Sequence, residues 1–266
     1  MLIPLALGLA VGLILALTGA GGGILAVPLL VFGSGIGVAQ AGPIGLLAVG
    51  MAAALGAILG LRAGVVRYRA ALLIAVTGMV FSPAGLWLAR RIDNRWLSVL
   101  FAFTLLYVAF NTFRKARGGN AATDTGKARA PVCVRGADTG RFIWTRPCAR
   151  ALAMSGSFAG LLSGLLGVGG GFVMIPALQR YTDLAMPSAV ATSLAVIALI
   201  SASGVLTSAA SGALAWSIAL PFAAGALAGM LGGRTLSKRL SGPHLQMAFA
   251  AISAAVALGM IAKAVL

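Results

Sequence analysis

The chain has 266 residues, of which 60% are hydrophobic and only 9% are charged, and its formal net charge is +16. Soluble domains carry about 25% charged residues, so the composition excludes a soluble globular domain and indicates an integral membrane protein. The basic residues lie almost wholly between long apolar runs, as loops retained in the cytoplasm do. This distribution argues against a nucleic-acid-binding protein.

Eight apolar elements follow one another along the chain. Six have about the length needed to cross 30 Å of hydrocarbon, and the first element of each half is longer and is broken by glycines. The eight elements cover residues 2–33, 38–61, 70–89 and 96–113 in the first half, and residues 151–179, 186–209, 214–236 and 244–265 in the second. The segment between them is basic and rich in Gly, Ala and Thr, which is typical of a flexible linker. The sequence predicts an all-α membrane protein with a first repeat at 1–113, a cytoplasmic linker at 114–149 and a second repeat at 150–266.

A glycine-rich motif interrupts the first element of each half. GAGGGILAVPLL at residues 19–30 returns as GVGGGFVMIPAL at residues 167–178, at an offset of 148 residues. In both copies three consecutive glycines are followed five positions later by a proline. The recurrence indicates an internal repeat, and paired helix breaks are a strong sequence pointer to the substrate site of a transporter.

The basic residues also predict a topology. If all eight elements cross the membrane, the two sides carry 13 and 7 Lys and Arg; if the two glycine-broken elements are re-entrant hairpins, the sides carry 16 and 4. The positive-inside rule favours the second arrangement. It leaves an odd number of crossings in each half, so the two repeats are inverted, with both termini outside and the linker in the cytoplasm.

The glycines are the first candidates for a binding site. Glycines at the start of a half-helix expose backbone N–H groups to a ligand, and the helix dipole favours an anion there. We therefore expect substrate contacts from Gly21, Gly22 and Gly23 in one half and from Gly169, Gly170 and Gly171 in the other. The alternative is that these glycines only permit close helix packing, as small residues at four-residue spacing do.

Polar side chains in the second and sixth elements are further candidates. Thr192 and Ser193 lie in the stretch AVATSLAV, and the corresponding stretch AQAGPIGL of the first half offers Gln40. The hydroxyls of Thr192 and Ser193 could donate to an anion or bond back to their own helix. We expect no catalytic residue, no cofactor and no metal site, and therefore no enzyme. The two cysteines, Cys133 and Cys148, are not in a CxxC pair, and we expect both to be reduced thiols.

Taken together, LTGAGGGILAVPLL, LSGLLGVGGGFVMIPAL and AVATSL resemble the sulfite exporter TauE/SafE family over the whole chain except the linker. The resemblance implies a plasma-membrane permease, in a bacterium the inner membrane, for small sulfur-containing anions such as sulfite or sulfoacetate. The stretch AQAGPIGL departs from the family pattern, which puts a hydroxyl contact from the first half in doubt. The expected partners are the anionic substrate and the lipid bilayer, with no nucleic acid; a homodimer stays open. An anion channel and a non-transport membrane scaffold are the alternatives.

Overall fold

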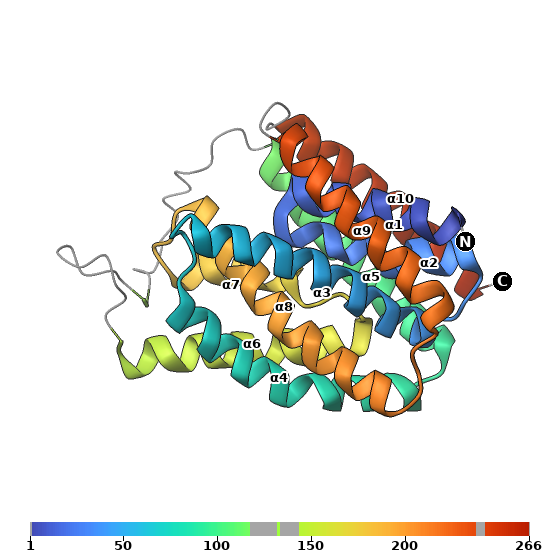
Figure 1. The fold of residues 1–266 in the computed structure, drawn as a ribbon, viewed down its shortest axis with the longest axis horizontal. Coiled ribbons are helices and arrows are strands. Elements are labelled where there is room, and N and C mark those ends of the chain that lie inside the picture. Colours follow the sequence, from blue (N-terminus) through green and yellow to red (C-terminus); the bar gives the residue numbers. More distant parts are fainter. Residues whose placement is uncertain (1, 118–131, 134–143, 238–242, 266) are drawn as a thin grey trace.

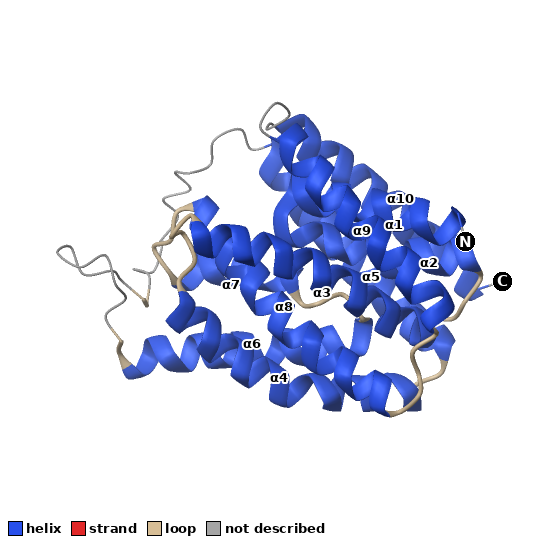
Figure 2. Cartoon of the chain, viewed as in Figure 1, coloured by secondary structure: helices blue, strands red, loops and turns tan. Residues whose placement is uncertain are grey.

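The structure is a computed structural model that describes residues 2–117, 132–133, 144–237 and 243–265. The described residues form α-helices and one 3-10 segment joined by loops (Figure 2). An isolated β-bridge among them joins Cys133 to Thr182. Within these ranges, six helices are long and apolar enough to cross a membrane. The prediction of an all-α membrane protein is confirmed.

The helices follow the predicted elements closely. The first half contains α1 (Leu2–Thr18), η1 (Gly19–Leu25), α2 (Ala26–Ser34), α3 (Val38–Arg62), α4 (Tyr68–Arg91) and α5 (Asn94–Arg117). The second half contains α6 (Arg146–Leu166), α7 (Gly171–Tyr181), α8 (Met186–Ala210), α9 (Trp216–Ser237) and α10 (Pro243–Val265). Helices α5 and α6 each extend a few residues into the predicted linker, and α6 begins there because Thr145 caps it and Pro147 lies in its first turn. Most of the linker lies outside the described residues.

Each major helix pair joins one half of the chain to the other (Figure 1). Helix α1 packs along α9, α6 along α4, α3 along α8 and α5 along α10. At the offset of 148 residues, α6 corresponds to α1 and α9 corresponds to α4. The α1–α9 pair and the α6–α4 pair are therefore the same contact, made once by each half. The two halves are interlocked, and α3 and α8 contribute the most completely buried of the long helices.

Glycines let these paired helices approach at backbone distance. A Cβ added at Gly8 or Gly12 of α1 would collide with backbone carbonyl groups of α9, and one added at Gly225 or Gly229 of α9 would collide with those of α1. Gly160 of α6 meets the backbone of α4 in the same way. Packing is therefore the role of these glycines, as small-residue motifs have in membrane helices generally.

The chain turns back on itself at both glycine motifs. The side chain of Leu7, early in α1, lies against Gly33 near the end of α2, so α2 returns to the end of the bundle at which α1 begins. Helix α7 likewise returns to the start of α6, because Tyr181 accepts a backbone hydrogen bond from Cys133, which is bonded to Cys148. The end at which α1 begins, where both chain termini lie, is called the terminal end (Figure 1). The opposite end, at which α6 begins, is called the linker end.

The linker end is held together by a disulfide that the sequence did not predict. Cys133 and Cys148 are bonded, with their Cα atoms 5.1 Å apart, and both residues are fully buried. The prediction of two reduced thiols was wrong, because a bridge depends on how the loop folds and not on the spacing of its cysteines. Here the N–H of Cys133 donates to the Tyr181 carbonyl over 2.9 Å. This bond places the Cys133 side chain beside the first turn of α6, where Cys148 lies.

Loss of this disulfide should destabilise the linker end. Closing a loop of about 15 residues is worth roughly 3 kcal/mol in the chain-entropy account, so Cys148→Ser should lower the thermal stability of the purified protein. Denaturation without reductant, followed by a thiol-reactive polyethylene glycol, should modify neither cysteine of the natural chain. Modification of both cysteines in that sample would show that the bridge is not formed.

Candidate functional site

The second glycine motif forms a tight turn that only glycine accommodates well. Gly167, Gly169 and Gly170 have φ angles of 71°, 74° and 68°, in the left-handed region that L side chains rarely adopt. Gly167 caps the C-terminus of α6, and Gly170 is the N-cap of α7. The prediction that these glycines lie at the start of a half-helix is met here, since α7 begins at Gly171.

The first glycine motif has a different backbone. Residues 19–25 form the 3-10 segment η1, and the α-helix that follows begins only at Ala26. Gly21, Gly22 and Gly23 therefore lie within η1 and not at the first turn of the α-helix, as the sequence had suggested. A 3-10 turn keeps backbone hydrogen bonds running through the break, so this half offers fewer open N–H groups than the second.

The two glycine motifs meet at the centre of the bundle. A Cβ at Gly23 would lie 3.3 Å from the carbonyl oxygen of Val168 and 2.9 Å from Cγ1 of Val49 in α3. On the other side, Gly167 packs against Gly42, and its carbonyl oxygen would lie 2.9 Å from a Cβ at Gly45. We call this contact region of η1, residues 167–171, α3 and α8 the glycine junction. Gly42 and Gly45 explain the stretch AQAGPIGL, which supplies room for the turn.

A serine hydroxyl points into the glycine junction. Ser201 of α8 is fully buried, and its Oγ has no hydrogen-bond partner among the described residues. This atom lies 3.1 Å from the position of a Cβ at Gly169, and the Ser201 Cβ lies 2.7 Å from the position of a Cβ at Gly50 of α3. Sequence reasoning missed Ser201. The available signal was its spacing of eight residues from Ser193, which places both on one face of α8.

Two further buried hydroxyls belong to helices around the junction. The Oγ atoms of Ser82 in α4 and Ser163 in α6 are also buried without a partner within the described chain. Ser82 lies near Gly204, one turn beyond Ser201 on α8. Buried hydroxyls in proteins are normally hydrogen-bonded, and an unpaired one costs about 1–3 kcal/mol. The three lie on helices that pack against one another, α4, α6 and α8.

The predicted polar residues have other contacts. The hydroxyl of Thr192 accepts a hydrogen bond of 3.1 Å from the backbone N–H of Arg67, and therefore holds the α3–α4 loop against α8. Ser193 donates to the carbonyl of Val190 in its own helix over 2.8 Å. Gln40 is exposed in the first turns of α3, near the terminal end. None of the three offers the glycine junction a free donor in this conformation.

The junction offers donors without offering charge. The first N–H groups of α7 that donate to the backbone are those of Val173 and Met174, and both donate to the carbonyl of Gly170. Within the described chain, the N–H groups of Gly169, Gly170 and Gly171 have no backbone acceptor. The side chains that line the junction, such as Val49, Ile197 and Ser201, carry no charge. The described ranges also hold no group of three metal-ligating side chains.

A bundle of membrane-spanning helices whose two helix breaks meet at a buried centre defines a multi-pass membrane protein of the transporter class. The chain belongs to the sulfite exporter TauE/SafE family, which matches residues 4–260. It is 30% identical over 255 residues to a probable membrane transporter protein of Xylella fastidiosa (strain 9a5c), covering 94% of this chain and 91% of that protein. It is 26% identical over 242 residues to the probable membrane transporter protein YunE of Bacillus subtilis (strain 168), covering 88% and 87%. No solved structure gives a significant match.

These matches confirm the resemblance seen in the glycine motifs. The protein is a multi-pass transporter of the bacterial inner membrane, and the family to which it belongs is one of membrane transporters.

Proposed function

We propose that this transporter carries sulfite or a small organosulfonate and binds the anion at the glycine junction. The observation that carries the proposal is the unpaired, fully buried Ser201 hydroxyl beside the left-handed turn that opens α7. Open N–H groups at a helix N-terminus favour an anion through both hydrogen bonding and the helix dipole. A hydroxyl on the opposite wall adds a donor that fixes the orientation of the anion.

A site made of N–H and O–H dipoles suits an anion that must also leave. Desolvating an anion is costly unless several donors replace its water, and the donors here are uncharged. An arginine in the same place would add a charge-assisted bond that is roughly twice as strong as a neutral one. We infer that the site binds the anion well enough to select it and weakly enough to release it on the far side.

Access to the site requires the helices to move. Gly169, Gly170 and Ser201 are buried, so the conformation described is closed around the junction. Helix α1 of the first half packs on α9 of the second, and α6 of the second half packs in the corresponding way on α4 of the first. We propose that the halves are inverted repeats whose rocking opens the junction to one side of the membrane at a time. An open channel would instead need a continuous pore, and a scaffold would leave the Ser201 hydroxyl unexplained.

Uptake by the purified protein in liposomes tests the proposed function. Radiolabelled sulfite should enter with saturable kinetics, should show counterflow and should be displaced by sulfoacetate more effectively than by taurine, which carries an added ammonium group. Flux that rises linearly with concentration would indicate a channel. Uptake no greater than in empty liposomes, with ion gradients varied, would contradict the proposal.

The orientation in the membrane is a separate proposal, and two observations oppose each other. In the topology predicted from the sequence, the side of the linker carries 16 of the 20 Lys and Arg, which favours the cytoplasm for that side. The disulfide lies at the same end, and disulfides are rare in the cytoplasm. We give the charge bias precedence, because it acts during insertion and the bridge, being fully buried, is shielded from cytoplasmic reductants.

Labelling in intact cells decides the orientation. With Cys133 and Cys148 replaced by serine, a cysteine introduced as Asp124→Cys should resist a membrane-impermeant maleimide until the cells are opened. The matched site at the terminal end, Asp93→Cys, should react without opening. The reverse pattern would place the linker and its disulfide outside.

A further inference from the structure

A groove on the outer surface of the bundle is unrelated to the glycine junction. It runs between α5, α6 and α7, has a volume of about 960 Å³ and is lined chiefly by apolar side chains such as Phe103, Phe158 and Phe172. Phe103 and Phe158 are each more than half exposed, as side chains that face lipid are. We call it the α5–α6–α7 groove.

The groove has an apolar deep part and a basic mouth. The hydroxyls of its threonine and serine are bonded within their own helices, since Thr104 donates to Leu100 over 2.9 Å and Ser155 donates to Ala151 over 2.8 Å. Arg150, in the second turn of α6, and Arg180, in the last turn of α7, both line the groove at the linker end. Among the described residues neither arginine has an acidic partner, and Arg180 lies 6.0 Å from the centre of the Tyr181 ring.

At the counterpart position in the other half, an aromatic side chain packs against α10. Phe32 corresponds to Arg180 at the offset of 148 residues, and its ring would lie 3.2 Å from a Cβ at Gly259 in α10. The ammonium group of Lys263 lies 5.8 Å from the same ring. The second half therefore has a cation where the first half has an aromatic side chain packed on α10.

We propose that the α5–α6–α7 groove binds an anionic phospholipid, with its phosphate between Arg150 and Arg180 and its acyl chains along the apolar deep part. Basic pockets between membrane helices recognise anionic headgroups in this way. The chiefly apolar lining of the deep part argues against a path for a polar solute, which would need hydrogen-bonding groups along its whole length. The charge at the mouth argues against a second copy of the chain, whose linker end is equally basic.

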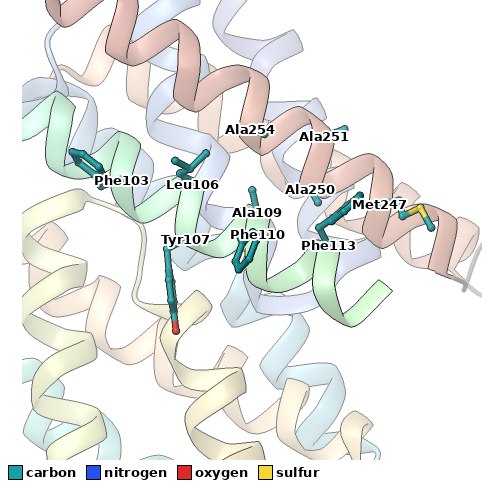
Figure 3. A pocket seen from close by; sticks show the side chains of 10 residues that line it. All are labelled: Phe103, Leu106, Tyr107, Ala109, Phe110, Phe113, Met247, Ala250, Ala251 and Ala254. Carbon is teal, nitrogen blue, oxygen red and sulfur yellow. The ribbon is translucent and has the colours of Figure 1, made fainter. Parts of the chain in front are cut away.

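The neighbouring groove between α5 and α10 provides a contrast. It has a volume of about 690 Å³ and is lined by aromatic and small apolar residues, among them Phe110, Phe113 and Ala254 (Figure 3). No charged residue lines it, so it has nothing to hold a headgroup. Tyr107 contributes to both grooves, and its ring points away from α10 (Figure 3).

Native mass spectrometry of the purified chain tests this proposal, and it does so independently of which anion is transported. With equal amounts of phosphatidylglycerol and phosphatidylcholine offered, the protein should retain phosphatidylglycerol selectively. The double variant Arg150→Ala/Arg180→Ala should lose that preference by roughly 10- to 30-fold, from the attraction of two surface arginines for an anionic lipid. Ser155→Trp, which fills the groove, should lower retention of both lipids.

Arg69→Ala is the matched control. Arg69 is an exposed arginine at the linker end that lies 5.9 Å from the centre of the Tyr68 ring, yet it does not line the groove. This variant should retain phosphatidylglycerol as the natural chain does. Equal retention of the two lipids, an equal loss in Arg69→Ala, or displacement of the lipid by inorganic phosphate would each overturn the proposal. Crosslinking between copies through Ser155→Cys would overturn it in favour of a dimer interface.

Discussion

Replacing Ser201 with alanine should raise the KM for sulfite uptake roughly 10- to 100-fold, the value of one hydrogen bond to a charged group. The stability of the empty protein should not fall. The Ser201 hydroxyl is buried without a partner, so its removal relieves an unmet hydrogen-bonding requirement. A residue that only stabilises the fold would show the opposite pattern. Uptake kinetics and thermal unfolding of the same preparation measure the two effects together.

Ser253→Ala is the matched control for this experiment. Ser253 is also a fully buried serine whose hydroxyl lacks a partner within the described chain, but it lies in α10, away from the glycine junction. Its replacement should leave the KM for sulfite unchanged. Equal kinetics in Ser201→Ala and the natural protein, or an equal rise in both variants, would remove Ser201 from the site.

Gly167→Ala should lower the free energy of unfolding by about 2–5 kcal/mol and abolish transport. The φ angle of 71° costs an L residue roughly 1–2 kcal/mol. The added methyl group would also collide with the backbone of Gly42 in α3, and overpacking of this kind costs about 1–3 kcal/mol. The turn and α3 would have to separate, which opens the junction. Denaturant or thermal unfolding in detergent measures the loss.

Gly212→Ala separates the two causes. Gly212 has a φ angle of 66° in the α8–α9 loop, and a Cβ there would meet nothing within 4 Å. Only the cost of the left-handed backbone should remain, about 1–2 kcal/mol, and transport should persist. Equal destabilisation by the two substitutions would mean that the contact between Gly167 and Gly42 contributes nothing.

Close backbone contacts also make Gly22 unsuitable as a mutational probe of the first glycine motif. A Cβ at Gly22 would lie 2.6 Å from the backbone nitrogen of Leu15, so any side chain at this position displaces α1. Loss of transport in such a variant would not distinguish binding from folding. Ser201 is the better probe because its replacement removes atoms and adds none.

Much of the fold could be predicted from the sequence because it follows from solvent and length. Apolar runs of membrane-crossing length fix where helices such as α3 and α8 lie, and the repeated glycine motifs mark both breaks. The predicted helix break in the second half has a physical reason. Only glycine adopts the left-handed turn at Gly167 and tolerates the contact with Gly42.

The details of the candidate site could not be predicted, because they depend on which faces meet. Ser201 and Thr192 are both buried hydroxyl-bearing residues of α8, and only the packing shows that one faces the junction while the other holds the α3–α4 loop. The two glycine motifs are alike in sequence, yet one forms a 3-10 segment and the other a left-handed turn. The disulfide depends on the path of a loop that carries no periodic pattern.

The most direct test of an anion at the glycine junction uses selenite, the heavier analogue of sulfite. Crystals of the protein soaked in selenite would be measured at the selenium absorption edge, and the anomalous signal would locate the anion. We predict a peak within hydrogen-bonding distance of the Ser201 Oγ and the N–H groups of Gly169 to Gly171, and its loss in Ser201→Ala. A peak elsewhere, with the junction empty under conditions in which selenite competes with sulfite uptake, would contradict the account.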